Sequence, residues 1–321
     1  MKRLDTEVGV KRIDFFRNQL ILFKKDKSLN IVEGKFLSPK QYLDKYLVDY
    51  GLKIYDLITK EKIEESNQGF SSIFAINKNE LLCKKVDYEK ENVDYYIFSF
   101  IDKDYNKIKR SLEGAPAVFV DDEYLINRSQ EFIYCYKNYN QIWQLDISDL
   151  CAYDVGNGLE KAELSNLYSD EEFVYLLAGL SILKVSIQSG EIIWHTKLNT
   201  AQSRGLIQDG YLYTTSNAYI NKIDCQTGQI LYQEGFDYIT IDHEKTLGPI
   251  KELAWYGDSI WTIMDSNPSA LIEINPTDGS YKSVVPLKVL GITKDCQMPR
   301  FHDDKMYLLD FDGTLHIFEL S

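Results

Sequence analysis

The second half of the chain repeats one order of short segments, and this repeat constrains the fold more than any other feature. Its clearest copy has an Asp-Gly turn and an aromatic strand (208–213), an alternating strand (219–224), and a Thr-Gly turn with a closing strand (226–231). Alternation of period two is typical of a β-strand, and glycine supplies the positive φ that a tight hairpin turn needs. The repeat therefore predicts a series of antiparallel sheets.

Other copies keep this order on both sides of the clearest one. Their strand-forming segments are 52–57, 95–100, 106–108, 132–136, 140–143, 173–177, 182–187, 189–194, 259–261 and 270–274. The turn before each closing strand is expected at Glu61, Asn106, Asn140, Gly190, Gly228 and Gly279, with gaps of 45, 34, 50, 38 and 51 residues, about 44 on average. A unit of this length holds four short strands, the size of one β-propeller blade.

The last copy is incomplete. It begins at Asp303 and ends with its third strand, Thr314–Leu320. A blade of three strands leaves an open edge, which a closed propeller fills with a strand from the N-terminal part of the chain. We expect Val10–Phe16 or Leu20–Phe23 to supply that strand.

The number of copies favours seven blades, and a further degenerate copy around Asp26 would make eight. We expect one all-β propeller domain over residues 1–321, because no Pro-, Gly- or Ser-rich linker divides the chain. Residues 1–40 are expected to hold the closing strand and an irregular first blade, and residues 303–321 the last blade.

Two copies resemble the repeats of pyrrolo-quinoline-quinone (PQQ)-like β-propeller proteins. Gln188–Trp194 and Gln226–Leu231 each contain a Ser/Thr-Gly turn followed by a closing strand, and the first of these strands carries the tryptophan of that family's signature. The resemblance is good over Asn166–Leu287 and weak elsewhere. It implies that Trp143 and Trp194 pack between blades.

The family that these repeats resemble includes quinone-dependent dehydrogenases, and the sequence argues against that activity. Those enzymes use a calcium site, a catalytic Asp and commonly two adjacent cysteines on an exported chain. The cysteines here, Cys83, Cys135, Cys151, Cys225 and Cys296, are never adjacent, and Met1–Asn18 has no apolar signal segment. We expect the non-catalytic branch of the family, without a cofactor.

Other catalytic or metal-binding patterns are also missing from the sequence. The histidines, His195, His243, His302 and His316, are scattered, with no metal-ligand spacing. We expect His195 and His316 in strands and His302 beside a turn. The segment Asp310–Gly313 carries two aspartates, which we interpret as a β-turn rather than a calcium loop because the further ligands are missing.

Charge and cysteine content set the expected partner and compartment. The formal net charge of -13 and the pI near 4.9 exclude a binder of nucleic-acid backbones, which needs a basic surface. The longest apolar run, Val174–Ile187, is too short and too polar to span a membrane. Unpaired, widely spaced cysteines suit a reducing compartment, so we expect a cytoplasmic protein.

Acidic residues recur in the first turn of the copies. These are Asp121, Asp122 and Glu123, then Asp170, Glu171 and Glu172, then Asp209, Asp258, Asp303 and Asp304. First and third turns of antiparallel blades lie on one side of a propeller, so we expect these acids on one rim. Asp is also common in tight turns for conformational reasons. The rim would nevertheless attract a basic protein partner.

The opposite side should carry the longest connections, where binding commonly resides. The candidate partner-binding residues there are Arg128, Tyr153, Asp154, Asn157, Asn217, Tyr238, His243, Lys251, Asp265, Asn267 and Arg300. Solvated loop tips of no function are the alternative interpretation of these residues.

We therefore expect a non-enzymatic, cytoplasmic, protein-binding propeller that is monomeric when unbound and takes a basic protein partner, neither nucleic acid nor membrane. One specific form of this hypothesis is an immunity-type protein that neutralises a basic toxin. The alternative is an intracellular enzyme or binder that takes a small molecule or glycan in the central funnel, with Arg128, His243, Lys251 or Arg300 as pocket residues.

Overall fold

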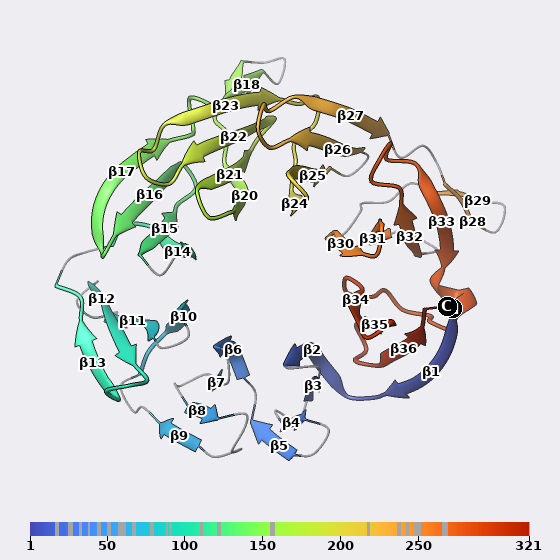
Figure 1. The fold of residues 1–321 in the computed structure, drawn as a ribbon, viewed down its shortest axis with the longest axis horizontal. Helices are drawn as coiled ribbons and strands as arrows, with labels where there is room; N and C mark the ends of the chain where they lie inside the picture. Colours follow the sequence, from blue (N-terminus) through green and yellow to red (C-terminus); the bar gives the residue numbers. More distant parts are fainter. Residues whose placement is uncertain are drawn as a thin grey trace. The chain divides into compact units, whose positions relative to one another are not determined.

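The structure is a computed structural model whose described residues form two compact units (Figure 1). Unit 1 comprises Met1–Lys11 and Asp146–Ser321, and unit 2 comprises Arg12–Leu145. The description covers the chain except residues 17–18, 25–27, 32–33, 38, 44–45, 50–52, 57–61, 66–68, 78–79, 88, 90–91, 110–111, 121–122, 155–157, 217–218, 236–238, 242–243, 247–251, 265–268 and 321.

Three sheets of unit 1 have four antiparallel strands in chain order. They are β20 (Leu164–Ser169), β21 (Phe173–Ala178), β22 (Ser181–Ser186) and β23 (Ile192–Lys197); β24 (Arg204–Gln208), β25 (Tyr211–Thr215), β26 (Tyr219–Asp224) and β27 (Ile230–Gly235); and β30 (Ala254–Tyr256), β31 (Ser259–Met264), β32 (Ala270–Ile274) and β33 (Tyr281–Pro286). The connections hold the hairpins β18 (Tyr153–Asp154) with β19 (Leu159–Glu160) and β28 (Ile239–Ile241) with β29 (Glu244–Thr246), and the 3-10 helix η1 (Leu287–Leu290).

The fourth sheet of unit 1 joins the two ends of the chain. Its order is β34 (Arg300–His302), β35 (Lys305–Leu309), β36 (Leu315–Glu319) and then β1 (Lys2–Glu7), which pairs antiparallel with β36. This confirms that an N-terminal strand closes the last blade.

The segment expected to supply that closing strand was wrong. Val10–Phe16 is β2, and Leu20–Phe23 falls in β3 (Gln19–Lys24), both of another sheet. The side chains of β1 are exposed except the half-buried Glu7, because β1 is the outermost strand. Such a strand has no buried side that would impose apolar alternation on its sequence, so hydropathy did not reveal it.

A polar contact connects the exposed Arg3 of β1 to buried residues of the last sheet. Arg3 donates from Nη2 to Nδ1 of His316, and Nε2 of His316 lies 3.0 Å from Oδ2 of Asp310. Because a guanidinium only donates, Nδ1 accepts and Nε2–H donates to the carboxylate. Burial opposes ionisation of Asp310, yet hydrogen bonds from the Thr314 N–H and from His316 outweigh it and lower the pKa of that carboxyl.

Unit 2 repeats the same sheet. Its strands are β2 (Val10–Phe16), β3 (Gln19–Lys24), β4 (Ser28–Ile31) and β5 (Gly34–Leu37); β6 (Pro39–Leu43), β7 (Tyr46–Asp49), β8 (Lys53–Asp56) and β9 (Lys62–Glu65); β10 (Ser72–Asn77), β11 (Glu80–Asp87), β12 (Asn92–Ser99) and β13 (Asp104–Lys107); and β14 (Ala115–Val120), β15 (Tyr124–Arg128), β16 (Phe132–Lys137) and β17 (Asn140–Asp146). The described residues thus form eight four-stranded sheets, the larger of the two expected counts. The extra copy is β2–β5, in the region around Asp26, which itself lies outside the description.

Two of the expected turn positions are strand residues. Asn106 lies within β13, whose hairpin turn is residues 100–103, and Asn140 begins β17 after the two-residue turn Asn138–Tyr139. The turns of these sheets are shorter than the Gly-containing turns of unit 1, so matching by spacing shifted them along the chain. Gly190, Gly228 and Gly279 do lie in turns, with φ of 73°, 74° and 78°.

Apolar cores lie between consecutive sheets. Within unit 1, β20 contacts β24, and β23 and β27 lie at the opposite edge of their sheets (Figure 1). Tyr175 and Leu177 of one sheet are buried with Leu212 and Ile223 of the next. In unit 2, β6, β10 and β14 contact in the same way.

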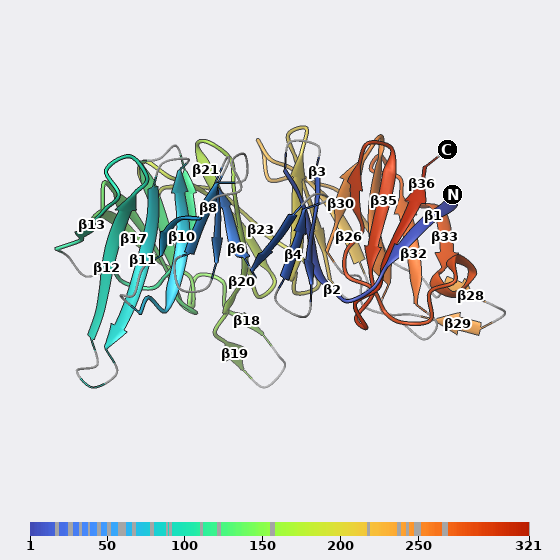
Figure 2. The same cartoon turned by 90° about the horizontal axis from the view of Figure 1, so that it is seen from below.

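The sides of unit 1 differ in what they carry. The hairpins β18–β19 and β28–β29 lie on the side opposite the end of β36 and the start of β1 (Figure 2). The chain runs antiparallel through each sheet, so first and third turns lie on the side of the β36 end, while second turns and connections lie with the hairpins. This is the arrangement expected from the repeat.

Candidate interaction surface

Carboxylates line the first turns of unit 1. They are Asp170, Glu171 and Glu172 before β21, Asp209 before β25, Asp258 before β31, and Asp303 and Asp304 before β35. Turn geometry explains part of this pattern, because Asp209, Asp303 and Asp304 have φ of 52°, 46° and 55°, which Asp tolerates better than most residues. It does not explain the exposed Glu171 and Glu172, whose φ is not positive.

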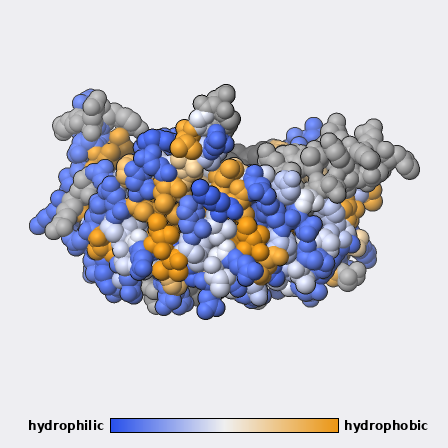
Figure 3. Space-filling model, turned by 90° about the horizontal axis from the view of Figure 1, so that it is seen from above, coloured by the Kyte–Doolittle hydropathy of each residue, from blue (hydrophilic) through white to orange (hydrophobic). Residues whose placement is uncertain are grey.

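The third turns of unit 1 add to the same side. Residues 187–191 and 275–280 contribute Glu191 and Asp278, and Asp224 precedes the turn 225–229. None of these first and third turns contains Lys, Arg or His. We call the resulting surface the acidic face; its members are Asp170, Glu171, Glu172, Glu191, Asp209, Asp224, Asp258, Asp278, Asp303 and Asp304. Along the lower edge of the side view, hydrophilic residues predominate, with smaller areas of intermediate and hydrophobic residues between them (Figure 3).

Hydrogen bonds keep several of these carboxylates ionised. The Thr227 N–H and hydroxyl donate to Oδ1 of Asp224 at 2.8 and 3.0 Å, and the Ser280 hydroxyl donates to Oδ1 of Asp278 at 2.6 Å. These bonds lower the pKa of both carboxyls. Asp170 accepts from the hydroxyl of the buried Tyr175 at 2.9 Å. Asp224 and Asp278 therefore stay ionised well below neutral pH.

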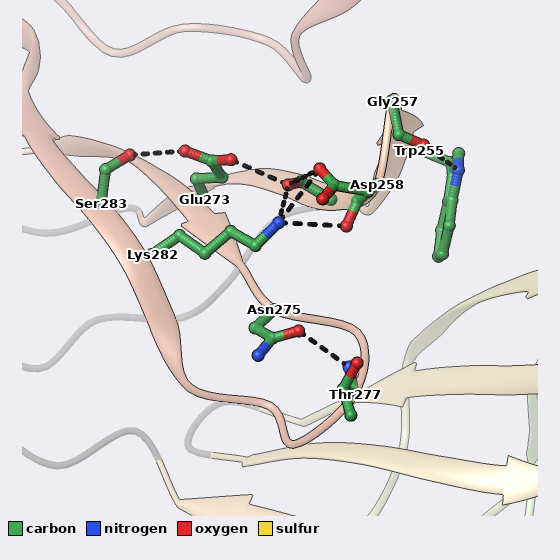
Figure 4. A network of polar contacts seen from close by, with 9 residues as sticks. Trp255, Gly257, Asp258, Glu273, Asn275, Thr277, Lys282 and Ser283 are labelled. Atoms are coloured by element: carbon green, nitrogen blue, oxygen red, sulfur yellow. Dashed lines mark hydrogen bonds and ion pairs between the residues drawn. The ribbon is translucent and has the colours of Figure 1, made fainter.

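One member of the face is compensated by a polar network (Figure 4). Nζ of Lys282 lies 3.0 Å from Oδ1 of Asp258 and 2.8 Å from Oγ of Ser259. Ser259 and Ser283 donate to the two carboxylate oxygens of Glu273, at 2.8 and 3.0 Å. The hydrogen bond from Lys282 is the main reason that the pKa of Asp258 is lowered.

The remaining acids are largely uncompensated. His302 lies 3.2 Å from Asp303, and the Tyr256 hydroxyl donates to Asp304. Within the described ranges, Glu171 and Glu172 have no ion pair. Unit 1 therefore presents exposed negative charge that its own side chains do not neutralise.

The side with the hairpins is mixed in charge. Lys161 pairs with Asp149 at 3.7 Å, and Lys294 with Asp312 at 3.6 Å. Arg300 is the exposed first residue of β34. Among the described residues of this side, charges of both signs lie close together, so these residues do not select a partner by the sign of its charge.

Tyr153 has a packing role within the hairpin β18–β19. A Cβ atom placed on Gly179, which has φ of 54°, would lie 2.9 Å from the Tyr153 ring, so the ring rests on the second turn of the sheet β20–β23. The buried Cys151 and Ala162 anchor the hairpin from both ends. Asp154 is exposed beside Tyr153, and Leu159 is 78% exposed.

The candidate residues from the sequence fall on different parts of the chain. Glu171 and Glu172 belong to the acidic face, Tyr153 and Asp154 to the hairpin, Arg300 to β34, and the exposed Arg128 ends β15 in unit 2. Outside the described residues lie Asp121, Asp122, Asn157, Asn217, Tyr238, His243, Lys251, Asp265 and Asn267. Binding by any of these residues, and the alternative of a small-molecule or glycan funnel, stay predictions.

The expected packing of Trp194 is confirmed. Its ring lies over Gly228 of the next sheet, where an added Cβ would approach Cδ2 to 2.7 Å, and its Nε1 donates to the carbonyl of Cys225 at 3.1 Å. Trp143 is half-buried in β17, and its packing between blades stays a prediction.

Sequence reasoning missed the lysines that accompany this contact. Lys184 donates to the Cys225 carbonyl at 2.8 Å and lies 3.8 Å from the centre of the Phe173 ring, and Lys222 donates to the Pro276 carbonyl at 3.1 Å. The signal was available as a lysine within the apolar third strand of consecutive copies.

His195 and His316 lie at the positions that the sequence predicted, and the cysteines are buried. His195 and His316 lie in β23 and β36, and Asp310 begins a tight turn in which the Gly313 N–H donates to the Asp310 carbonyl, as expected. The cysteines are unpaired and buried, and burial raises the pKa of the Cys83 and Cys135 thiols to about 12. In the part of the chain that the structure describes, no group of His, Cys, Asp and Glu could hold a metal ion.

Apolar surface is dispersed. Ile193 of β23 and Leu231 of β27 are 44% and 46% exposed on the outermost strands. Seen from this side, hydrophobic residues form narrow stripes separated by hydrophilic ones (Figure 3). Among the described residues, no helix is long and apolar enough to cross a membrane.

No protein-family profile and no curated protein matches the sequence. Solved structures match over nearly the whole chain. BamB from Moraxella catarrhalis has a TM-score of 0.65 at 9% identity and 99% coverage of both chains. The computationally designed protein Ika8 has a TM-score of 0.67 at 12% identity, covering 99% of this chain and 98% of its own. Sqt1 from Saccharomyces cerevisiae has a TM-score of 0.64 at 10% identity and 99% coverage of both chains.

TM-scores of 0.64 to 0.67 over nearly the whole chain establish the fold, and at identities of 9 to 12% these likenesses establish the fold alone. The chain is an all-β propeller of four-stranded blades that resembles PQQ-like repeat proteins, as the sequence predicted. Many functions share this fold, so the function has to be argued from the surface.

Proposed function

We propose that this chain is a non-enzymatic propeller that binds a basic protein through its acidic face. The observation that carries the proposal is the set of first and third turns in unit 1, which hold carboxylates and no Lys, Arg or His. A surface of one sign speeds the encounter with a partner of the opposite sign and rejects partners of its own sign.

A more specific form of the proposal is an immunity-type protein that neutralises a basic toxin by covering it. The net charge of -13 and the hydrogen bonds that keep Asp224 and Asp278 ionised favour a strongly basic target. We place the protein in the cytoplasm, since its thiols are unpaired and buried, and propose that it is monomeric until it binds.

Matched charge reversals test the acidic face. The variant Glu171→Lys/Glu172→Lys changes two exposed residues of that face, and Glu160→Lys/Glu163→Lys makes the same charge change at exposed residues of the hairpin region. Tagged proteins are used to capture partners from the source cells at low and at high salt. We expect a basic protein that is retained by the wild type and by the hairpin variant, lost with the acidic-face variant, and released by salt.

Equal retention by both variants would place binding elsewhere. Absence of a stoichiometric protein with all three baits would contradict a protein-binding role. For the immunity-type form, the captured protein must itself be toxic when the propeller is missing, and its toxicity must return with the acidic-face variant.

A further inference from the structure

Equivalent positions in the sheets can be matched by strand register. In the sheet β20–β23, Lys184 of the third strand pairs with Trp194 of the fourth, and in β24–β27 Lys222 pairs with Tyr232. Each lysine also pairs with the third residue of its second strand, which is Tyr175 or Tyr213. In β10–β13, the same register holds Ile97 paired with Asn106, because Ile97 pairs with Leu82, the third residue of β11.

The lysine and the ring together fill one space between sheets of unit 1. Lys184 and Trp194 both donate to the Cys225 carbonyl, and the Trp194 ring covers Gly228. At the next interface, Lys222 and Tyr232 both donate to the Pro276 carbonyl, and the Tyr232 ring covers Gly279. This space lies between the outer strand of one sheet and the third turn of the next.

In unit 2 the same space is open. Ile97 and Asn106 are smaller than the lysine and the aromatic ring, and the third turn of the next sheet is the two-residue turn Asn138–Tyr139, with φ of 48° and 61°. A cavity of about 280 Å³ results. It is lined by Ile97, Asn106, Lys107, Ile108, Lys109, Asn138, Tyr139 and Asn140. Its walls are therefore the counterparts of the residues that make the filled contact elsewhere.

The lining defines what could enter. Ile97, Ile108 and Tyr139 provide apolar surface for a flat ring, and the Asn106 amide supplies a donor and an acceptor. Nδ2 of Asn140 donates to the Asn138 carbonyl at 3.1 Å, and its amide oxygen is a further acceptor. Two lysines and no carboxylate line the cavity. Lys107 is paired with Asp94 at 2.7 Å, which leaves the exposed Lys109 as the cation for an incoming anion.

We propose that this cavity binds a planar aromatic group that carries an N–H or O–H donor and a nearby carboxylate. The ring would take the place that Trp194 and Tyr232 occupy at two interfaces of unit 1, with its donor bonded to an amide or backbone carbonyl of the turn. The carboxylate would pair with Lys109. The site lies in unit 2 and is independent of the acidic face, which lies in unit 1.

The probes are N-acetyl-tryptophan, which carries a carboxylate, and N-acetyl-tryptophanamide, which does not. Binding is measured by saturation-transfer NMR and by calorimetry. We expect both to bind the wild type, with the carboxylate several-fold tighter, and we expect Lys109→Gln to remove that preference. In Asn106→Trp, which restores the ring of the other interfaces, affinity should fall at least tenfold and the thermal midpoint should rise.

A second filling variant and a control keep the test decisive. Asn106→Tyr reproduces the ring of Tyr232 and is a second, smaller way to fill the cavity. Its affinity for both probes should also fall at least tenfold, whether or not the larger ring of Asn106→Trp packs well. Asp104→Trp places a ring on the exposed start of β13, away from the lining, and should bind both probes as the wild type does. No binding to the wild type at millimolar probe, or equal binding to the wild type and to both filled variants, would overturn the proposal.

Discussion

The filled interfaces of unit 1 and the open interface of unit 2 are built on one strand register with different side chains. At Lys184 and Trp194, the third and the fourth strand each supply one donor to the Cys225 carbonyl of the next sheet. Where Ile97 and Asn106 stand, a cavity replaces that contact. The backbone of a blade therefore does not depend on this contact, and a repeat can lose it and leave a binding site behind.

The sheet β30–β33 is a third case. Glu273 occupies the lysine register and Ser283 the aromatic one. The carboxylate is held by Ser259 and Ser283 of its own sheet, and Lys282 turns to Asp258 (Figure 4). The same position can thus serve contact between sheets or contact within one sheet.

The largest expected effect comes from breaking a filled interface at its glycine. Gly228→Ala would put a Cβ 2.7 Å from Cδ2 of Trp194 at φ of 74°, and we expect a loss of about 3 kcal/mol from left-handed strain plus overpacking. Gly210→Ala is the control, since its φ is 79° but nothing lies within 4 Å of the added Cβ; it should lose about 1 kcal/mol. Denaturant unfolding of both variants measures the difference, and equal losses would mean that the ring contact is unimportant.

Removing a lysine charge tests whether the interface lysine of unit 1 contributes more to stability than an exposed lysine of unit 2. Lys184→Met keeps the length of the buried side chain but loses its hydrogen bond to the Cys225 carbonyl and its contact with the Phe173 ring, for an expected loss of about 2 kcal/mol. Lys107→Met changes an exposed lysine of unit 2 and should leave the unfolding midpoint unchanged within error. Similar shifts in the two variants would contradict a special role for the interface lysine.

The smallest expected effect concerns the polar network of the sheet β30–β33. In Lys282→Met, Asp258 loses the hydrogen bond that chiefly lowers its pKa, so this pKa should rise toward the ordinary carboxyl value. A lowered folded-state pKa stabilises the protein above the unfolded-state pKa, and this contribution is lost as pH falls through the folded value. NMR titration of the Asp258 carboxyl carbon in both proteins measures the shift. Asp278, lowered by Ser280 instead, should titrate unchanged.

Much of unit 1 could be predicted from the sequence because its turns contain glycines and acidic residues at regular positions. The glycines at 190, 228 and 279 have the positive φ expected of them, and the acidic first turns lie on one side as the strand order requires. In unit 2 the third turns at 100–103 and at Asn138–Tyr139 have four and two residues and no glycine, so spacing placed Asn106 in a turn instead of in β13.

The closing strand β1 and the cavity at Asn106 could not be predicted, because neither produces a recognisable hydropathy pattern in the sequence. The exposed strand β1 has no buried side, so the sequence predicted the open edge of its partner β36 but not which N-terminal segment pairs with that edge. The cavity at Asn106 is a missing contact, which a sequence shows only after the register of Lys184 and Lys222 has been aligned with it.

The pairing of β1 with β36 also means that the last sheet cannot be completed until the end of the chain has been synthesised. Arg3 and His316 are 313 residues apart, so at 5–20 residues per second the partner of β1 is made roughly 15 to 60 s after β1 itself. During that interval the ribosome-bound chain holds a segment with no sheet to join. Because most side chains of β1 are polar and stay exposed even when it is paired, the unpaired strand is well solvated and has little tendency to aggregate.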